Sequence, residues 1–127
     1  LKFDMLDNFP FNDDYTDLII ADLSLHYFND FDTKKIISEI KRVLRKDGYL
    51  FVRVNSTNSS EYKMLVDSSK ELEHHLYFNN GMEKRFFDNL DIKKYFAEFK
   101  CIYSCECNMN RWCNDKIVWT LIFRNNK

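Results

Sequence analysis

The sequence predicts an α/β fold, in which a mixed β-sheet is flanked by helices. A strand is expected over residues 16–21, where four successive apolar residues are typical of a strand covered on both faces. An amphipathic helix over residues 33–45 follows, and a second apolar strand covers residues 49–55. Strand, helix and strand in this order are the signature of a crossover between two parallel strands.

The helix of this crossover has a single apolar stripe, by which we expect it to dock on the sheet. Asp32 or Thr33 is expected to cap its first turn, because both side chains accept hydrogen bonds from free backbone amides. Gly48 is expected to supply the left-handed residue that ends it. The stripe consists of Ile36, Ile37, Ile40, Val43 and Leu44.

The segments outside the crossover are predicted from shorter signals. Residues 1–5 have the pattern of the end of a further strand, and residues 62–73 have room for a short helix. Asn80 and Gly81 predict a hairpin turn, because both tolerate positive φ. Asp88 is expected to cap a helix over residues 89–97. Two strands, over residues 100–108 and 116–124, are expected to pair antiparallel because the link between them is short.

Composition bounds the class of protein. The 127 residues predict one domain, and an apolar share of 45% supplies a core. Nineteen basic and twenty acidic residues leave a net charge of −1, which gives no electrostatic footprint for nucleic acid. No signal peptide or membrane-spanning run is apparent, so we expect a cytoplasmic protein whose cysteines are reduced thiols.

Six short motifs, in matching order and spacing, resemble one known family. Together they are similar to the second half of a class I S-adenosylmethionine-dependent methyltransferase of the small-molecule type. The resemblance implies a truncated Rossmann-like mixed β-sheet flanked by helices, forming a single partial methyltransferase-like domain over residues 1–127. The motifs are Asp4, the pair Pro10 and Phe11, residues 15–21, the turn of Leu25, His26 and Tyr27, residues 42–45, and the strand that begins at Gly48.

The same resemblance implies S-adenosylmethionine as cofactor and a small molecule as substrate. His26 occupies a position that faces the substrate in this family, and it is the candidate catalytic residue. From residue type alone, His26 is a packed or hydrogen-bonded histidine and Asp4 is a turn former. Asp22 adds a charge where the family often has a small residue. The implied cofactor contacts are Asp4 and Met5 at the adenine, and Ala21, Asp22 and Leu23 at the mouth of the next strand.

The family's glycine-rich cofactor turn has no counterpart here, since the only glycines are Gly48 and Gly81. Its absence disfavours autonomous methyl transfer and leaves three interpretations open. The chain is a methyltransferase acting on a small molecule, a non-catalytic remnant that serves as a binding or dimerisation module, or a fragment whose site another segment completes.

The missing strands also leave the first strand of the crossover without a neighbour. A bare apolar edge recruits another chain or aggregates. We therefore expect a homodimer through the edge formed by Leu18, Ile19, Ile20 and Ala21, or shielding of that edge by residues 1–5.

Neither the cysteines nor the adjacent histidines predict a metal site. Cys101, Cys105 and Cys107 share one face of the expected strand, but with Cys113 they lack the paired C-x2-C spacing of zinc sites. Buried small hydrophobic residues are the better account of them. His74 and His75, placed in a strand, would point to opposite faces, which does not suit one metal ion.

Overall fold

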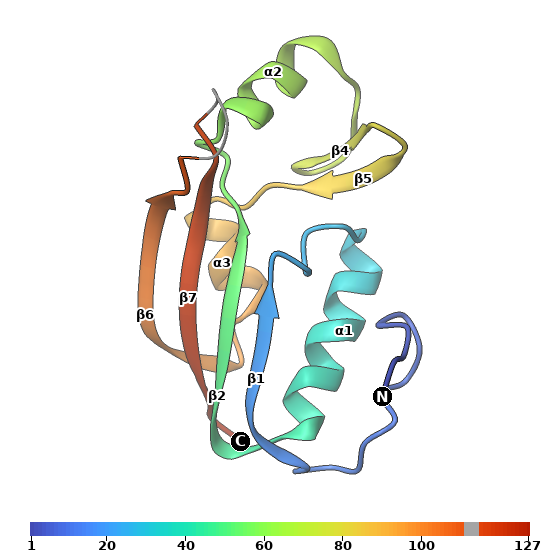
Figure 1. Ribbon diagram of the computed structural model, residues 1–127, viewed down its shortest axis with the longest axis vertical. Coiled ribbons are helices and arrows are strands. Elements are labelled where there is room, and N and C mark those ends of the chain that lie inside the picture. The colour runs from blue at the N-terminus through green and yellow to red at the C-terminus, as the bar shows by residue number, and fades with distance from the viewer. Residues whose placement is uncertain (111–114) are drawn as a thin grey trace.

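The computed structural model describes residues 1–110 and 115–127 and confirms the α/β fold (Figure 1). A four-stranded sheet with the strand order β1-β2-β7-β6 forms its centre. β1 and β2 are parallel, and the two remaining pairs are antiparallel, as the crossover and the short C-terminal link predict. The strands are β1 (Thr16–Asp22), β2 (Leu44–Asn55), β6 (Phe99–Asn108) and β7 (Ile117–Asn125).

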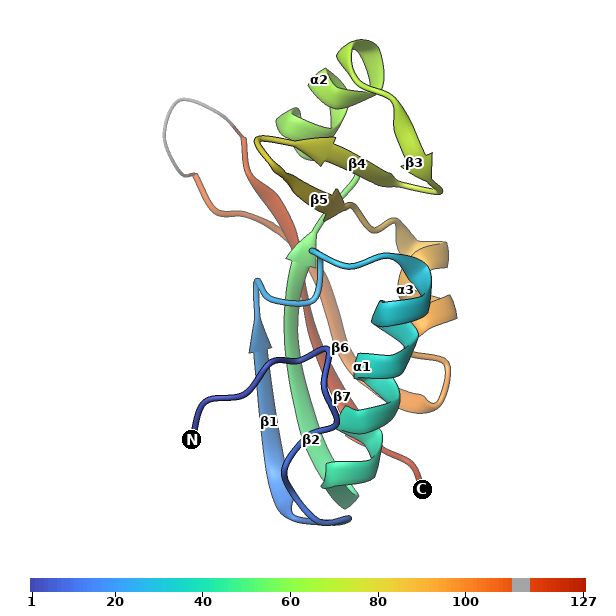
Figure 2. The same cartoon turned by 90° about the vertical axis from the view of Figure 1, so that its right-hand side faces the viewer.

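Two helices, α1 (Asp30–Val43) and α3 (Asn89–Tyr95), cover one face of this sheet (Figure 2). The predicted apolar stripe of α1 is buried against side chains of β2 and β7. In β2 the buried positions alternate, as expected for a strand with one face on the core. The central residues of this core are Ile36, Ile40, Leu50, Val52, Val54, Leu121 and Phe123.

The expected ends of α1 are wrong. Asn29 caps the helix, since its side chain accepts a hydrogen bond of 2.8 Å from the amide of Asp32. Thr33 lies inside the first turn instead, where its hydroxyl donates to the carbonyl of Asn29 at 2.7 Å. At the other end β2 begins directly after Val43, and the left-handed residue is Asp47, with φ 63°, rather than Gly48.

A second, three-stranded sheet lies between β2 and α3 in the chain. Its hairpin turns at Asn80 and Gly81, with φ of 52° and 79°, as predicted. Asp88 caps α3 through a capping box with Asp91, and the short helix expected near residue 62 is also present. These elements are α2 (Ser60–Ser68), β3 (Glu71–Glu73), β4 (Leu76–Asn79) and β5 (Met82–Arg85).

The N-terminal segment is not a strand, which corrects the expectation for residues 1–5. It turns back on itself through a hydrogen bond from the amide of Asp7 to the carbonyl of Asp4. Lys35 of α1 donates to the carbonyl of Leu6 at 2.6 Å. The segment therefore runs beside α1 (dark blue in Figure 1) rather than along β1.

β1 is the edge strand of the sheet, and only one of its faces is covered. Ile19 packs against the core and Ala21 is buried, whereas Leu18 is 53% exposed and Ile20 is 64% exposed. The prediction that both faces of β1 are covered is wrong for the described part of the chain, because α1 and α3 both lie on the same face of the sheet. Shielding by residues 1–5 is also wrong, since these exposures are found with that segment in place.

Gly48 is required by packing rather than by its backbone angles. A Cβ at this position would lie 2.8 Å from Cδ1 of Leu44 and 3.0 Å from the carbonyl oxygens of Arg45 and Asp17. Because two of these contacts are backbone atoms, they cannot move aside cheaply. We expect Gly48→Ala to lower the free energy of unfolding by about 1–3 kcal/mol in urea titration.

Gly81 provides the matched control for this substitution. A Cβ there meets nothing within 4 Å, and its left-handed φ suits asparagine. Gly81→Asn should change stability by less than about 1 kcal/mol. Equal losses in the two variants would contradict the packing role of Gly48.

Candidate functional site

The carboxyl ends of β1 and β2 meet at one edge of the sheet, where parallel sheets bind ligands. Ala21 is buried there, and Leu23 takes a left-handed conformation with φ 54°. The amide of Leu23 donates to the carbonyl of Arg53 at 3.0 Å, which fixes the sharp turn out of β1. We call this edge, formed by residues 21–26 and 53–56, the strand mouth.

The charge of Asp22 at the strand mouth is paired. Asp22 lies opposite Arg53 in the parallel register, and the guanidinium donates to both carboxylate oxygens at 2.5 and 2.8 Å. These hydrogen bonds raise the pKa of Arg53. Asp22 therefore adds a neutral ion pair to the mouth and not an isolated negative charge.

His26 lies inside the protein and joins the two strand ends. It is 1% exposed, and its Nδ1 accepts a hydrogen bond of 3.2 Å from the amide of Asn55. Burial, reinforced by the positive charges of Lys116 and Lys84, lowers the pKa of His26 to about 3. The imidazole is therefore neutral at pH 7, with its proton on Nε2.

Asn55 was missed by sequence reasoning, although it stands at the carboxyl end of the second strand. It is 2% exposed, and its Nδ2 has no hydrogen-bond partner in the described part of the chain. A buried donor of this kind is costly unless a ligand or water satisfies it. A polar residue that ends a parallel strand was the available signal.

Asp4 and Met5 lie on a separate loop beside α1. The carboxylate of Asp4 accepts a hydrogen bond of 2.9 Å from the amide of Leu6, and the residue is exposed. Met5 is half-buried and packs against the core. The structure thus places the predicted residues Ala21, Asp22, Leu23 and His26 at the strand mouth, and Asp4 and Met5 on the N-terminal loop, where Met5 packs on the same core as Ala21.

Arg42 of α1 holds the rest of this N-terminal loop. Its guanidinium donates to the carbonyls of Phe9 and Phe11, at 3.1 and 2.8 Å, and to the carboxylate of Asp13 at 2.8 Å. Hydrogen bonds to Glu39, then to Asp13, raise the pKa of Arg42. The helix therefore positions the loop that follows Asp4.

These residues suit one end of the implied cofactor better than the other. At the adenine end, Asp4 offers an acceptor and Met5 an apolar surface, and the turn at Leu23 offers backbone groups. At the methionine end, Gly48 lies within β2 and Gly81 in the β4–β5 turn, so neither forms a cradle at the strand mouth.

The cysteines do not share one face, which corrects that prediction. The register of β6 shifts between Cys101 and Tyr103, so a bulge turns Cys101 toward Phe123 and the helices. Cys105 and Cys107 lie together, with sulfurs 3.7 Å apart. None of the three is buried, so the interpretation as buried hydrophobic residues is also wrong, and Cys113 lies outside the described residues.

His74 and His75 do not point apart, as a strand would require. They occupy the turn between β3 and β4, where His75 has φ 61°. Their rings stack with centroids 3.7 Å apart, and both face Asp91. The prediction assumed that successive side chains alternate between the two faces of a strand. A turn with a left-handed residue does not have this alternation.

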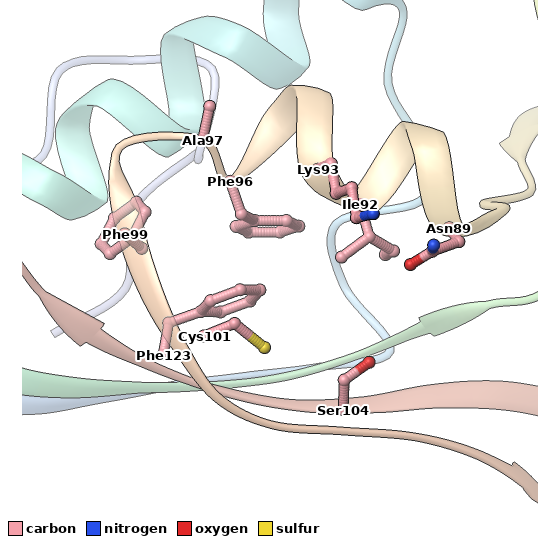
Figure 3. A pocket seen from close by; sticks show the side chains of 9 residues that line it. All are labelled: Asn89, Ile92, Lys93, Phe96, Ala97, Phe99, Cys101, Ser104 and Phe123. Carbon is pink, nitrogen blue, oxygen red and sulfur yellow. The ribbon is translucent and has the colours of Figure 1, made fainter.

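A pocket of about 470 Å³ lies between α3 and the β6–β7 pair (Figure 3). Phe96, Phe99 and Phe123 make it largely apolar, and its polar groups come from Asn89, Lys93, Cys101 and Ser104. It stands at the opposite edge of the sheet from β1. None of the residues predicted for cofactor or substrate lines it, so we do not assign the chemistry to it.

Comparison with known proteins gives a consistent answer for the fold. Residues 1–52 match the family described as "Methyltransferase domain". An S-adenosylmethionine-dependent methyltransferase from Methanosarcina mazei superposes with a TM-score of 0.84 at 15% identity, covering 98% of this chain. The chain has the class I methyltransferase fold. The resemblance predicted from the sequence motifs is thereby confirmed.

Two further solved structures with this fold contain S-adenosylhomocysteine. One is 1,6-didemethyltoxoflavin N1-methyltransferase from Burkholderia thailandensis, with a TM-score of 0.70, 16% identity and 91% of this chain covered. The other is the N-methyltransferase NodS from Bradyrhizobium japonicum, with a TM-score of 0.63, 14% identity and 98% covered. Comparison with curated protein sequences found no match.

The methyltransferase-fold chain is shorter than these proteins. It spans 65% of the Methanosarcina chain, 46% of the Burkholderia chain and 53% of the Bradyrhizobium chain. Within residues 1–110 and 115–127, no helix is long and apolar enough to cross a membrane.

The buried state of His26 makes a pH-dependent contribution to stability. Because its pKa falls from 6.5 to about 3 on folding, the folded chain binds fewer protons than the unfolded chain. The contribution is complete above pH 6.5 and is lost as the pH falls toward 3, with an upper limit of about 5 kcal/mol. The stability advantage of the natural chain over His26→Asn should shrink across this range.

Asparagine is chosen because its Oδ1 can replace Nδ1 as acceptor for the amide of Asn55. Urea unfolding of both proteins between pH 7 and pH 4 provides the measurement. Curves that run parallel over this range would show that His26 does not titrate on unfolding as the structure implies.

Proposed function

We propose that the chain provides the adenine edge and the strand mouth of an S-adenosylmethionine-dependent methyltransferase that acts on a small molecule. The observation that carries the proposal is the extent of the family match. It covers residues 1–52, and every predicted cofactor and substrate residue lies within them. The fold of the whole chain is in agreement with it.

Within this proposal each part of the chain has a distinct task. When bound, the cofactor supplies an electrophilic methyl group on a sulfonium. Asp4 accepts a hydrogen bond from the adenine while Met5 packs against it, and the backbone of Ala21 and Leu23 lines the strand mouth. His26 is neutral and buried, so it positions the turn toward the substrate; catalysis of this type depends mainly on positioning.

The buried Nδ2 of Asn55 is a further donor for the substrate side. It stands next to His26, whose ring accepts from the Asn55 amide. A polar acceptor on the methyl-accepting molecule would satisfy it. The glycine cradle for the methionine end would come from a complementary segment, which agrees with the greater length of the solved relatives.

Binding of S-adenosylhomocysteine, measured by calorimetry, tests the proposal. We expect weak binding by the natural chain and at least about tenfold weaker binding by Asp4→Asn, a loss of about 1.4 kcal/mol. Asparagine keeps the acceptor for the amide of Leu6, so the loop should stay folded.

Asp7→Asn is the matched control, because it removes the same charge from the same exposed loop. It should bind like the natural chain. No heat at high micromolar ligand would exclude cofactor binding by this chain alone. Equal losses of affinity in both variants would show that Asp4 contributes only its negative charge and no specific contact with the adenine.

The alternative proposal is a dimerisation module that uses the edge of β1. Leu18 and Ile20 are more than half exposed on a strand whose outer edge is unpaired in the described chain. A second copy pairing along this edge would satisfy the free backbone groups of β1 and would place its own side chains beside Leu18 and Ile20. The resulting homodimer would be isologous.

Light scattering at increasing protein concentration tests the dimer. We expect a dimer for the natural chain and a monomer for Ile20→Lys, because a lysine on an edge strand blocks pairing. Met64→Lys, an equally exposed apolar position on α2, is the control and should remain dimeric. A natural chain that stays monomeric at high concentration would contradict the alternative.

The proposal includes a cytoplasmic location and no nucleic-acid partner. Cys101, Cys105 and Cys107 are free thiols, as is usual in reducing compartments. The net charge of −1 provides no general attraction to phosphate backbones.

A further inference from the structure

Two histidines and two aspartates meet where the β3–β4 turn approaches the start of α3 (Figure 2). His74 and His75 come from the turn, and Asp88 and Asp91 come from the helix start. One ligand atom from each of the four side chains lies within 4.8 Å of all the others. We call these four residues the His–Asp cluster.

Asp91 is the centre of the His–Asp cluster. Its Oδ2 lies 2.6 Å from Nδ1 of His75, and its Oδ1 lies 3.5 Å from Nε2 of His74. The Asp91 side chain is 6% exposed, while that of His74 is 68% exposed. The cluster therefore has a buried carboxylate at its base and an open side through which an ion can enter.

Backbone contacts hold both histidines in place. The carbonyl of His74 accepts from Nη1 of Arg85 at 2.8 Å, and the carbonyl of His75 accepts from the amide of Phe86 at 2.9 Å. His75 also keeps a left-handed φ of 61°. The turn is thus fixed independently of the two imidazole rings.

The carboxylates are fixed by the capping box of α3. Asp88 accepts from the amide of Asp91 at 2.8 Å through Oδ1, and Asp91 accepts from the amide of Asp88 at 2.9 Å through Oδ2. Each carboxylate has a second oxygen for another partner. Such outer contacts orient the ligands of metal sites.

Helix capping explains the positions of the Asp88 and Asp91 side chains, and the contact with Asp91 explains that of His75. Neither explains why His74 is in the cluster. An exposed histidine gains little from a 3.5 Å contact with a carboxylate. The His74 ring is nevertheless held in the cluster, because it stacks on the His75 ring with centroids 3.7 Å apart and faces the same carboxylate.

We propose that the His–Asp cluster binds one divalent transition-metal ion of the zinc class. Two imidazole nitrogens and two carboxylate oxygens suit Zn²⁺, whereas Mg²⁺ and Ca²⁺ prefer oxygen ligands alone. The ion would clamp the β3–β4 turn to α3, and this inference is independent of the proposed methyl transfer.

The geometry needs only a small adjustment to accept the ion. Tetrahedral ligands at zinc distances stand about 3.3 Å apart. The His75–Asp91 contact of 2.6 Å must open, and the widest separation of 4.8 Å must close. Both changes require movements of about 1–2 Å by the side chains, which rotamer changes can supply without a change in the backbone.

Calorimetric titration of the tag-free natural chain with Zn²⁺ tests the site. We expect one ion per chain, a higher melting temperature with the ion bound, and shifts of the ring signals of His74 and His75 in NMR spectra. His26 is the internal reference, since it is the remaining histidine and lies in the core. Its ring signal should not move.

His74→Ala and His75→Asn are the test variants. His74 is exposed, and asparagine tolerates the left-handed backbone of residue 75, so both variants should fold. Each should weaken Zn²⁺ binding by more than the 10- to 100-fold usual for an outer contact. Asp67→Asn, at an exposed position on α2, should bind as the natural chain does.

The thiols of Cys105 and Cys107 are the competing ligands in this chain, because their sulfurs lie 3.7 Å apart. The double substitution Cys105→Ser and Cys107→Ser should leave Zn²⁺ affinity unchanged. The proposal is overturned if this variant abolishes binding, if the histidine variants keep their affinity, or if no binding is seen at 100-fold excess of Zn²⁺.

Discussion

The buried guanidinium of Arg85 makes the contacts that attach the three-stranded sheet to the rest of the molecule. Only 2% of this residue is exposed, and it donates to Glu73 and to the carbonyls of His74 and Phe28. Glu73 in turn accepts from the amide of Asp30, at the start of α1. The three-stranded sheet is thereby joined to the main core. A substitution of Glu73 would leave the charge of the buried Arg85 guanidinium without its carboxylate partner, which destabilises a fold.

The same segment also closes one side of the strand mouth. The amide of Arg85 donates to the carbonyl of His26 at 2.8 Å, and the amide of Phe87 donates to the carbonyl of Asn55 at 2.8 Å. The chain between β5 and α3 therefore crosses the ends of both parallel strands. Asp88 of the His–Asp cluster belongs to the same connection.

Local sequence patterns predicted the helices, strands and turns. Features that depend on contacts between distant residues could not be predicted from these patterns. The crossover, the turn at Gly81 and the cap at Asp88 follow from spacing and side-chain type, so the sequence was sufficient for them. The bulge beside Cys101 and the left-handed His75 depend on register and on backbone hydrogen bonds from distant residues. The Asp22–Arg53 pair needed only the parallel register, which was predictable in principle.

The successive apolar residues of β1 remain unexplained by the described chain, which covers only one face of this strand. Leu18 and Ile20 are already about half buried, so covering the rest of each side chain would stabilise the fold by about 1–2 kcal/mol. A strand paired there lies about 4.8 Å from β1, and its end would stand directly beside Ala21 and Leu23. Any segment that paired with β1 would therefore also lie beside the strand mouth. Edge pairing and ligand binding at this mouth would then depend on the same segment.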